Sequence, residues 1–506
     1  MMSTIHAIRA CLLMLLFSIP AFALADAHES GESADAEIPE PLNFVTEHRA
    51  RVGGSTIEYT ATAGTLEMLD DDEKPIAHFG YTSYVRKGGN QDERPVVFAY
   101  NGGPGSASMW LHMGILGPQR VVVEDLTFNT VGPFRRVNNE YSVIDVADLV
   151  MIDPIGTGFS RPVGEAEGEQ FWGVDNDIES VSAFISRWTS ENGRWASPKY
   201  LLGESYGGIR SGGVSLALLR RHNISLNGVI LVSPGMDMAT FDPWPGNDLP
   251  MVTYFTTYAA TAWYHRAIED RPDDLKGFLA EADAFAYGKL APYLLKGNRG
   301  TDAERQDVLA GMERFTGVSA EYWDRANLRI GEQHFAKELL RDRRQVVGRI
   351  DSRFVGDGID HNDSTLNYDP FFPSVGPGFV AAFNDYYRNA LGVTTTREYV
   401  TSAGLYGSWD WSHQVPGSRT QPVANTAVDL ELAMKQNPNM RVLVQQGYFD
   451  LAIPFGSVRH FIDHMDLPEH LRANLDLKMY EAGHMMYVHP ESMPRFKADL
   501  AAFIEK

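Results

Sequence analysis

The chain has 506 residues, 44% of them hydrophobic and 22% charged, an ordinary composition for a globular protein with a large core. Its formal net charge of −22 argues against a nucleic-acid partner, because phosphate binding needs a basic surface. The same charge suits a soluble protein whose copies repel one another.

The N-terminus has the pattern of a secretory signal peptide. Arg9 precedes an apolar stretch that closes on Ala23-Leu24-Ala25, a small-x-small cleavage site. The stretch is short for a membrane span, so we expect residues 1–25 to be removed, with an uncleaved anchor as the alternative. The mature chain would then be exported, periplasmic or secreted, and would have no stable membrane association. Cys11, the chain's only cysteine, lies inside this segment, so we expect no disulfide.

The next residues predict a layered α/β domain. Residues 26–41 are acidic and aperiodic, and we expect a disordered leader. Short antiparallel edge strands are expected at Ser55–Thr62 and Ile76–Arg86. Buried strands are predicted at Pro95–Tyr100, Asp148–Asp153, Lys199–Gly203, Gly228–Pro234, Met440–Gly447 and Leu475–Gly483, and helices at Val174–Asn192, Gly208–Arg221, Gly456–Met465 and Ser492–Glu505. This alternation predicts a doubly wound, mostly parallel sheet.

A long segment separates two of these strands. Residues 235–422 are rich in aromatics and mainly helical in pattern, with a capping box at Thr301–Glu304. Because a sheet needs no connection of this length, we predict a cap inserted over the C-terminal edge of the strands, where α/β sheets bind ligands. The core would then consist of residues 42–234 and 423–506.

One predicted strand ends in a motif typical of a serine nucleophile. Gly203-Glu204-Ser205-Tyr206-Gly207 follows a buried strand and runs directly into a helix. A sharp turn there forces Ser205 into a strained backbone conformation, for which the two glycines leave room. The serine hydroxyl would lie at a helix N-terminus, where N–H groups face a developing negative charge. The motif alone is weak, and a serine in a structural turn is the alternative.

Two further residues have the positions that a serine nucleophile requires. A base must take the serine proton, and a third group must orient the base. In α/β-hydrolases these residues come in the order serine, acid, histidine, each just after a strand. Asp450 follows one late strand and His484 the next, and no other of the fifteen histidines has this placement. We therefore predict the triad Ser205–Asp450–His484.

A glycine-rich segment after the first buried strand predicts the oxyanion hole. The segment Tyr100–Trp110 contains glycines that let the backbone approach a substrate and turn its N–H groups towards it. The hole would use the N–H groups of Gly103 and Tyr206, the residue after the nucleophile. An ordinary glycine-rich turn is the alternative.

At this point the chain resembles the serine carboxypeptidases, α/β-hydrolases with an inserted cap, as an exported, bacterial-type member without disulfides. The resemblance extends over nearly all of the mature chain. It rests on six motifs in order: Asn101–Ser108, Leu116–Pro118, Ile152–Ser160, Gly203–Gly208, Gly447–Asp450 and Ala482–Met485. It implies that Ser205 is the nucleophile, His484 the acid and base, and Asp450 the group that orients it.

The resemblance also implies how a peptide's C-terminus is held. The side chain of Asn101, the backbone of Gly102 and a protonated Glu204 would donate to the terminal carboxylate. A carboxylic acid beside an anion has a raised pKa, because two close negative charges are costly. Met485 would line the pocket for the departing residue.

The chain departs from the family pattern at one position that matters. The family has a second glutamate just before the Leu116–Pro118 step, where this chain has Ile115. Losing one of two paired acids puts the strength of carboxylate recognition and the preference for acidic conditions in doubt. Arg210, on the nucleophile helix, is a candidate replacement anion anchor, and a salt-bridged structural arginine is the alternative.

We therefore expect a serine carboxypeptidase that acts on peptides through an acyl-enzyme and needs no metal or cofactor. The polar run Asp357–Asp369 lacks the spacing of a calcium loop. An esterase or acyltransferase with the same triad is the first alternative, kept open by Ile115. A catalytically inactive binding protein is the second. The sequence does not indicate an oligomeric state.

Overall fold

The computed structural model describes residues 38–241, 244 and 246–506. The predicted signal peptide and the leader up to residue 37 lie outside the described residues. The central feature is a ten-stranded sheet, in which β8 (Arg161–Pro162) pairs only with β3. The other strands, in spatial order, are β1 (Asn43–Val52), β2 (Ser55–Leu69), β3 (Pro75–Arg86), β7 (Asp148–Ile152), β4 (Val96–Tyr100), β9 (Lys199–Glu204), β10 (Gly228–Val232), β15 (Arg441–Gly447) and β16 (Leu475–Tyr480).

The sheet combines an antiparallel edge with a parallel centre. Strands β1, β2, β3 and β7 pair antiparallel, whereas β7, β4, β9, β10, β15 and β16 form parallel pairs. Every residue of β4, β7, β9 and β10 is buried, as expected for parallel strands covered on both faces. The predicted doubly wound, mostly parallel sheet is confirmed. Strand β1 was not predicted, because its charged residues alternate with few apolar ones.

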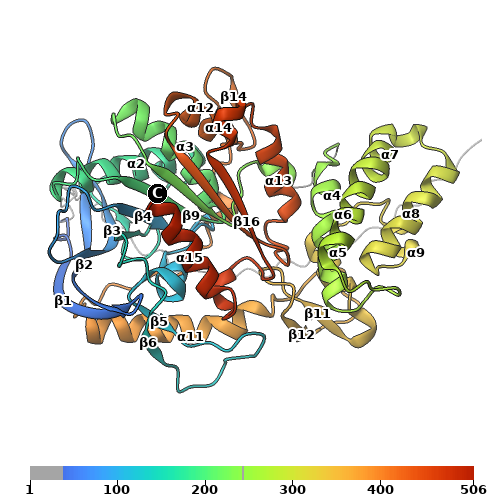
Figure 1. The fold of residues 1–506 in the computed structure, drawn as a ribbon, viewed down its shortest axis with the longest axis horizontal. Helices are drawn as coiled ribbons and strands as arrows, with labels where there is room; N and C mark the ends of the chain where they lie inside the picture. Colours follow the sequence, from blue (N-terminus) through green and yellow to red (C-terminus); the bar gives the residue numbers. More distant parts are fainter. Residues whose placement is uncertain (1–37, 242–243, 245) are drawn as a thin grey trace, which may run out of the picture. The chain divides into compact units, whose positions relative to one another are not determined.

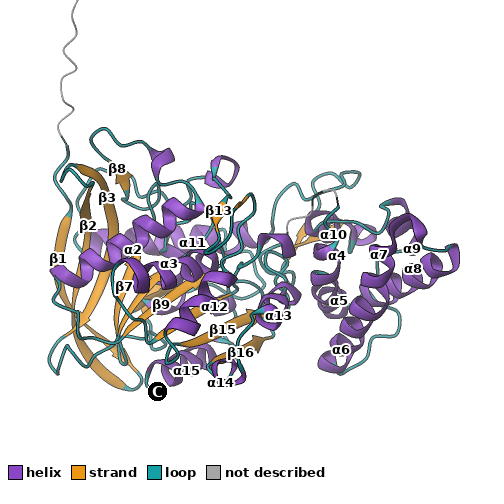
Figure 2. Ribbon diagram, turned by 90° about the horizontal axis from the view of Figure 1, so that it is seen from above, coloured by secondary structure: helices purple, strands orange, loops and turns teal. Residues whose placement is uncertain are grey.

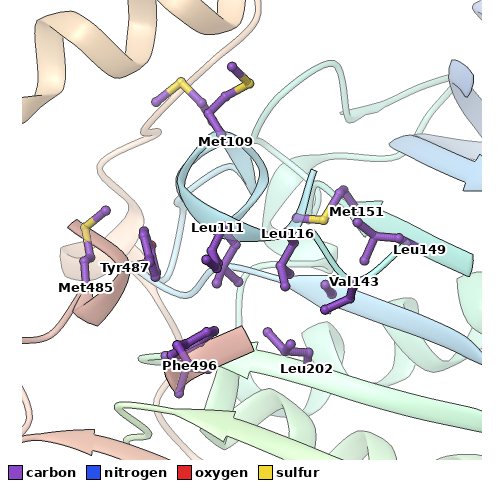
Figure 3. Packing of buried hydrophobic residues seen from close by; sticks show 14 of the residues in the cluster. Met109, Leu111, Leu116, Val143, Leu149, Met151, Leu202, Met485, Tyr487 and Phe496 are labelled. Atoms are coloured by element: carbon purple, nitrogen blue, oxygen red, sulfur yellow. The ribbon is translucent and has the colours of Figure 1, made fainter. Parts of the chain in front are cut away.

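Helices cover both faces of the sheet (Figures 1 and 2). One face is covered by α2 (Val174–Glu191), α3 (Gly207–Arg221), α12 (Ala427–Gln436), α13 (Phe455–His464) and α14 (Glu469–Arg472). The other is covered by α1 (Met109–Leu111), a π-helical turn (His112–Leu116), α11 (Phe371–Asp385) and α15 (Met493–Ile504). Figure 3 shows this second layer, where Leu111 and Leu116 face the sheet residues Leu149 and Leu202. Within the described ranges, no helix is long and apolar enough to cross a membrane.

The insertion between β10 and β15 first builds a helical cap with an apolar core of its own. Tyr258, Phe315 and Trp323 pack in this core, and Phe449, from the turn after β15, joins them. Thr301 and Glu304 form the predicted capping box at the start of α8. The helices of the cap are α4 (Leu249–Thr253), α5 (Phe255–Tyr264), α6 (Leu275–Phe285), α7 (Ala291–Lys296), α8 (Asp302–Thr316), α9 (Ala320–Arg325) and α10 (Glu332–Glu338), followed by a hairpin of β11 (Gln345–Val347) and β12 (Val355–Asp357).

The rest of the insertion returns along the sheet core. Helix α11 packs beside α1 in the core, far from the α5–α9 helices in Figure 1. Residues 399–426 then run over the core loops and include a small hairpin of β13 (His413–Gln414) and β14 (Thr420–Gln421). The Tyr399 hydroxyl donates to Asp153 Oδ1 at 3.1 Å, and the same oxygen accepts the Ser108 N–H at 2.8 Å. This returning segment therefore supports the glycine-rich segment that contains Ser108.

A buried histidine fastens the returning segment to the helices. His413 is 3% exposed and lies between two carboxylates, with Nδ1 2.6 Å from Asp175 on α2 and Nε2 2.9 Å from Asp429 on α12. Burial alone would favour the neutral ring, but both carboxylates bond to it and raise the pKa of His413 to about 9. The imidazolium is thus the form that the fold stabilises at neutral pH.

We predict that His413→Gln destabilises the protein in a pH-dependent way. The folded pKa of His413 lies above its unfolded value, so its contribution is complete below about pH 6.5 and disappears as the pH rises through about 9. The loss at pH 6 should be about 1.5–3 kcal/mol, as for hydrogen bonds to charged groups. Urea unfolding at pH 6 and pH 9.5 measures it, with exposed His361→Gln as the control. Equal losses at both pH values would contradict this role.

Candidate active site

The predicted nucleophile stands on a strained turn between β9 and α3. Ser205 has φ +63°, in the left-handed region, which costs a non-glycine residue about 1–3 kcal/mol. Its N–H donates to the Val232 carbonyl at 3.0 Å, and its carbonyl accepts the Gly235 N–H at 3.1 Å. A Cβ at Gly203 would lie 2.2 Å from the Gly207 carbonyl oxygen, so the turn needs glycine there. The fold thus holds Ser205 in the conformation expected from its sequence motif.

The predicted acid and base are directly bonded. His484 Nδ1 lies 2.7 Å from Asp450 Oδ2, and both side chains are buried. Asp450 Oδ1 accepts the N–H groups of Ala452 and Ile453, each at 2.9 Å, so the carboxylate is fixed by its own loop. The backbone N–H of His484 donates to the backbone carbonyl of Ile350, in the insertion, at 2.8 Å. The ring therefore has a defined orientation with Nδ1 on the aspartate.

Electrostatics favour a basic histidine at this position. Burial disfavours the charged imidazolium, but the charge and hydrogen bond of Asp450 outweigh burial and raise the pKa of His484. Ser205 and His484 both line one cavity of about 340 Å³. In the described part of the chain no hydrogen bond joins the Ser205 hydroxyl to His484 Nε2, and such bonds are often long in unliganded enzymes.

The glycine-rich segment packs directly against the nucleophile turn. A Cβ at Gly102 would lie 2.4 Å from the Tyr206 nitrogen and 2.6 Å from the Glu204 carbonyl oxygen, so no side chain fits between the two loops. Gly103 and Tyr206 both line the cavity. Over the described residues, neither of their N–H groups donates to a protein acceptor. These are the two donors predicted for the oxyanion hole.

Asn101 and Glu204 form a buried pair beside Ser205. Asn101 Nδ2 donates to Glu204 Oε1 at 2.7 Å, while Asn101 Oδ1 accepts the Leu111 N–H at 3.0 Å, which fixes the amide orientation. Burial and the nearby charge of Asp450 raise the pKa of Glu204 to about 7, although His484 acts in the opposite direction. Both residues line the cavity, as does Met485. A carboxylic acid that is neutral in mildly acidic solution thus adjoins the predicted nucleophile.

Arg210 is a structural arginine and does not face the cavity. It is fully buried, with Nε 2.7 Å from Asp177 Oδ2 and Nη1 donating to the Asn101 carbonyl at 2.7 Å. Its guanidinium lies 5.1 Å from the Tyr100 ring centroid and 5.2 Å from that of Tyr206. The suggestion that Arg210 is an anion anchor is therefore wrong. Ile115 likewise packs in the apolar core and not in the cavity wall.

Several cavity residues come from segments in which the sequence showed no motif. Arg349 and Glu332 belong to the cap, and Tyr254 opens α5. Their ionic or aromatic character resembles that of many surface or core residues, so sequence alone gave no signal for them. No group of three or more histidine, aspartate or glutamate side chains that could hold a metal ion occurs in residues 38–241, 244 and 246–506.

Comparison with known proteins finds a likeness to one family over part of the chain. Residues 61–268 match the family model of serine carboxypeptidases. The matched part contains the strands β4, β7, β9 and β10 and the segments around Asn101 and Ser205. Asp450 and His484 lie beyond it. The likeness to serine carboxypeptidases thus covers the nucleophile turn and the glycine-rich segment directly.

Individual relatives show the same partial likeness. Serine carboxypeptidase-like 36 of Arabidopsis thaliana is 30% identical over 171 residues, 32% of this chain and 33% of that protein. Serine carboxypeptidase-like 10 of the same plant is 25% identical over 174 residues, 32% of this chain and 37% of that protein. These matches therefore span about a third of the length of the curated relatives.

A solved structure extends the likeness in fold. Kex1(delta)p, a prohormone-processing carboxypeptidase from Saccharomyces cerevisiae, superposes with a TM-score of 0.54 at 15% identity. The superposition covers 88% of this chain and 91% of that one. The fold is that of the α/β-hydrolases, as predicted.

We predict that Arg210→Met destabilises the protein by about 3–5 kcal/mol, because it leaves Asp177 buried without its partner. Arg221→Met is the matched control. Arg221 lies on the same helix and pairs with Glu179 on the same α2 at 3.1 Å, but both side chains are more than half exposed, so the loss should be small. Urea unfolding of both variants compares them. Similar losses in the two would show that Arg210 has no special structural role.

Proposed function

We propose that this protein is a serine carboxypeptidase that releases C-terminal amino acids from peptides. The observation that carries the proposal is the buried Asn101–Glu204 pair next to Ser205, in one cavity with His484, whose ring is bonded to Asp450. Burial raises the pKa of Glu204 to about 7, so its acid form is populated in mildly acidic solution. A triad alone suits any acyl transfer. A protonated acid and an amide donor at its side suit a substrate that carries a carboxylate near the scissile bond.

The reaction would follow the general course of serine hydrolases. His484 Nε2 takes the Ser205 proton as the serine oxygen attacks the last peptide carbonyl. The N–H groups of Gly103 and Tyr206 stabilise the resulting oxyanion. His484 then gives its proton to the leaving amine, which departs as the free C-terminal amino acid and leaves an acyl-enzyme. Water, deprotonated by His484, releases the shortened peptide and restores Ser205.

The terminal carboxylate would be held by Asn101, Gly102 and Glu204. The Asn101 amide keeps one N–H for Glu204 and has a second for the substrate. Glu204 in its acid form donates a hydrogen bond to the carboxylate. This acid form predominates at a pH below about 7. Met485 would contact the side chain of the departing residue. We also propose that the protein is exported, on the signal-peptide pattern of residues 1–25.

Ile115 favours a second candidate, an esterase or acyltransferase. The family pattern has an acid at this position, and here an isoleucine is buried in apolar surroundings. With one acid in place of two, a weaker carboxylate site would leave the triad free to act on esters. Both candidates share the acyl-enzyme and differ in the group that leaves.

We predict that the mature protein removes the last residue from peptides with a free C-terminus and not from amidated peptides. Ser205→Ala should lose the activity and also fail to react with a fluorophosphonate probe. Mass spectrometry of the products measures release. Equal or faster cleavage of simple esters, without peptide release, would support the esterase or acyltransferase. An unlabelled Ser205 in the native protein would support an inactive binding protein.

A second prediction concerns the pH dependence of substrate binding. Glu204 loses its proton above about pH 7 and then repels the substrate carboxylate, so KM for free-carboxyl peptides should rise, at most about tenfold per pH unit. Glu204→Gln keeps a donor that cannot ionise, so its KM should stay level across pH 6–9. Cleavage of a neutral ester provides the control, since no carboxylate is bound. A rise of KM in Glu204→Gln that matched the native protein would assign the ionisation to another group.

A further inference from the structure

Arg349 is the one lysine or arginine among the described residues that line the active-site cavity. It lies in the cap, one residue before Ile350, whose carbonyl accepts the His484 N–H at 2.8 Å. The backbone that carries Arg349 is therefore attached to the catalytic histidine.

The guanidinium of Arg349 is bonded through Nε only, and its two terminal nitrogens are unbonded within the described residues. Its Nε donates to Glu332 Oε1 at 3.2 Å, and the same oxygen accepts from Gln333 Nε2 at 3.4 Å. Across the described residues, neither Nη1 nor Nη2 forms a hydrogen bond. The side chain of Arg349 is 36% exposed, compared with 18% for Glu332. Arg349 is thus a partly exposed residue of the cavity wall, with two terminal nitrogens that form no hydrogen bond within the described residues.

The acidic groups around Arg349 keep its guanidinium charged. Burial disfavours its charge, but Glu332, Tyr254, Asp369 and Asp450 act against burial and raise the pKa of Arg349. Asp369 already accepts the backbone N–H groups of Ile350 and Phe371. Arg210, by contrast, is fully buried with two of its nitrogens bonded. Arg349, unlike Arg210, lines the cavity, and within the described residues neither of its terminal nitrogens forms a hydrogen bond.

We propose that Arg349 binds a second carboxylate of the substrate, the side chain of an aspartate or glutamate at one of the two residues flanking the scissile bond. A planar guanidinium with two free terminal nitrogens matches a carboxylate in bidentate geometry. The inference rests on the proposed carboxypeptidase function, in which Asn101 and Glu204 hold the terminal carboxylate on the core side of the cavity. Glu332 is a positioning residue for Arg349 and does not contact the substrate.

The test compares N-blocked dipeptides with a free C-terminus that carry Glu, Gln or Lys at either position, with Leu at the other, at pH 6 and low salt. The native protein should prefer Glu to Gln at one position by at least about tenfold in kcat/KM, as expected for a charge-assisted bidentate pair. In Arg349→Met the ratio should fall to about one while the Gln peptides keep their rates. Arg349→Lys should retain part of the preference, because it keeps the charge without the planar donor pair.

Arg325→Met is the matched control, since Arg325 is an exposed cap arginine paired with Glu321 and does not line the cavity. It should leave the Glu-to-Gln ratio unchanged. A ratio that Arg349→Met does not alter, an equal loss for all peptides, or a preference for Lys would each overturn the proposal. An equal loss would assign Arg349 to the terminal carboxylate, and a Lys preference would assign the subsite to Glu332.

A binding measurement separates this inference from the proposed function. N-acetylglutamate and N-acetylglutamine are compared for protection of Ser205 against a fluorophosphonate, in the native protein and in Arg349→Met. Stronger protection by N-acetylglutamate that is lost in the variant supports the Arg349 site even if no peptide is cleaved. Release of neutral residues with equal protection by both compounds would support the carboxypeptidase and overturn the Arg349 site.

Discussion

The arrangement of the site depends on one buried ion pair, that of Arg210 with Asp177. The guanidinium lies near the rings of Tyr100 and Tyr206 and donates to the Asn101 carbonyl. It therefore joins helix α2, the glycine-rich segment and the nucleophile helix in a single contact. Buried ion pairs are costly to form and costly to break, so this one fixes a geometry more than it adds net stability.

That geometry tolerates little change, because the glycine-rich segment and the nucleophile turn are in contact through their backbones. Gly102 leaves no room for a Cβ against Glu204 and Tyr206, and Ser205 is held in a strained conformation. Strain of this kind persists only where the surroundings determine it. Here the surroundings include the hydrogen bonds of Ser205 with Val232 at the end of β10 and with Gly235 just after it. They also include the returning segment, in which Tyr399 donates to Asp153. The core and the second half of the insertion thus act together on the site.

The sequence predicted the parts of the fold whose patterns are local. The six strands predicted for the parallel part of the sheet are short runs rich in apolar residues that end in turn residues, and their pattern needs no tertiary information. Ser205, Asp450 and His484 could be selected because each follows such a strand. Strand β1 was missed because its register depends on pairing with β2, and its own residues are mostly polar.

The cap side of the site could not be predicted in this way. Arg349 and Glu332 meet the cavity because the hairpin of β11 and β12 brings Ile350 to His484, a contact between residues far apart in the chain. The same limit applied to Arg210. Its position on the nucleophile helix suggested an anion anchor, and only the packing of α2 against α3 shows that it faces Asp177. Side-chain direction on a helix depends on what covers the helix.

The high pKa of Glu204 has a consequence for proton uptake and release during substrate binding. In mildly alkaline solution the free site holds an ionised Glu204, and a bound carboxylate beside it would raise that pKa further. A substrate would then bind together with a proton taken from solvent, and its products would leave with one. Glu204 would then take up one proton and release it again in each turnover.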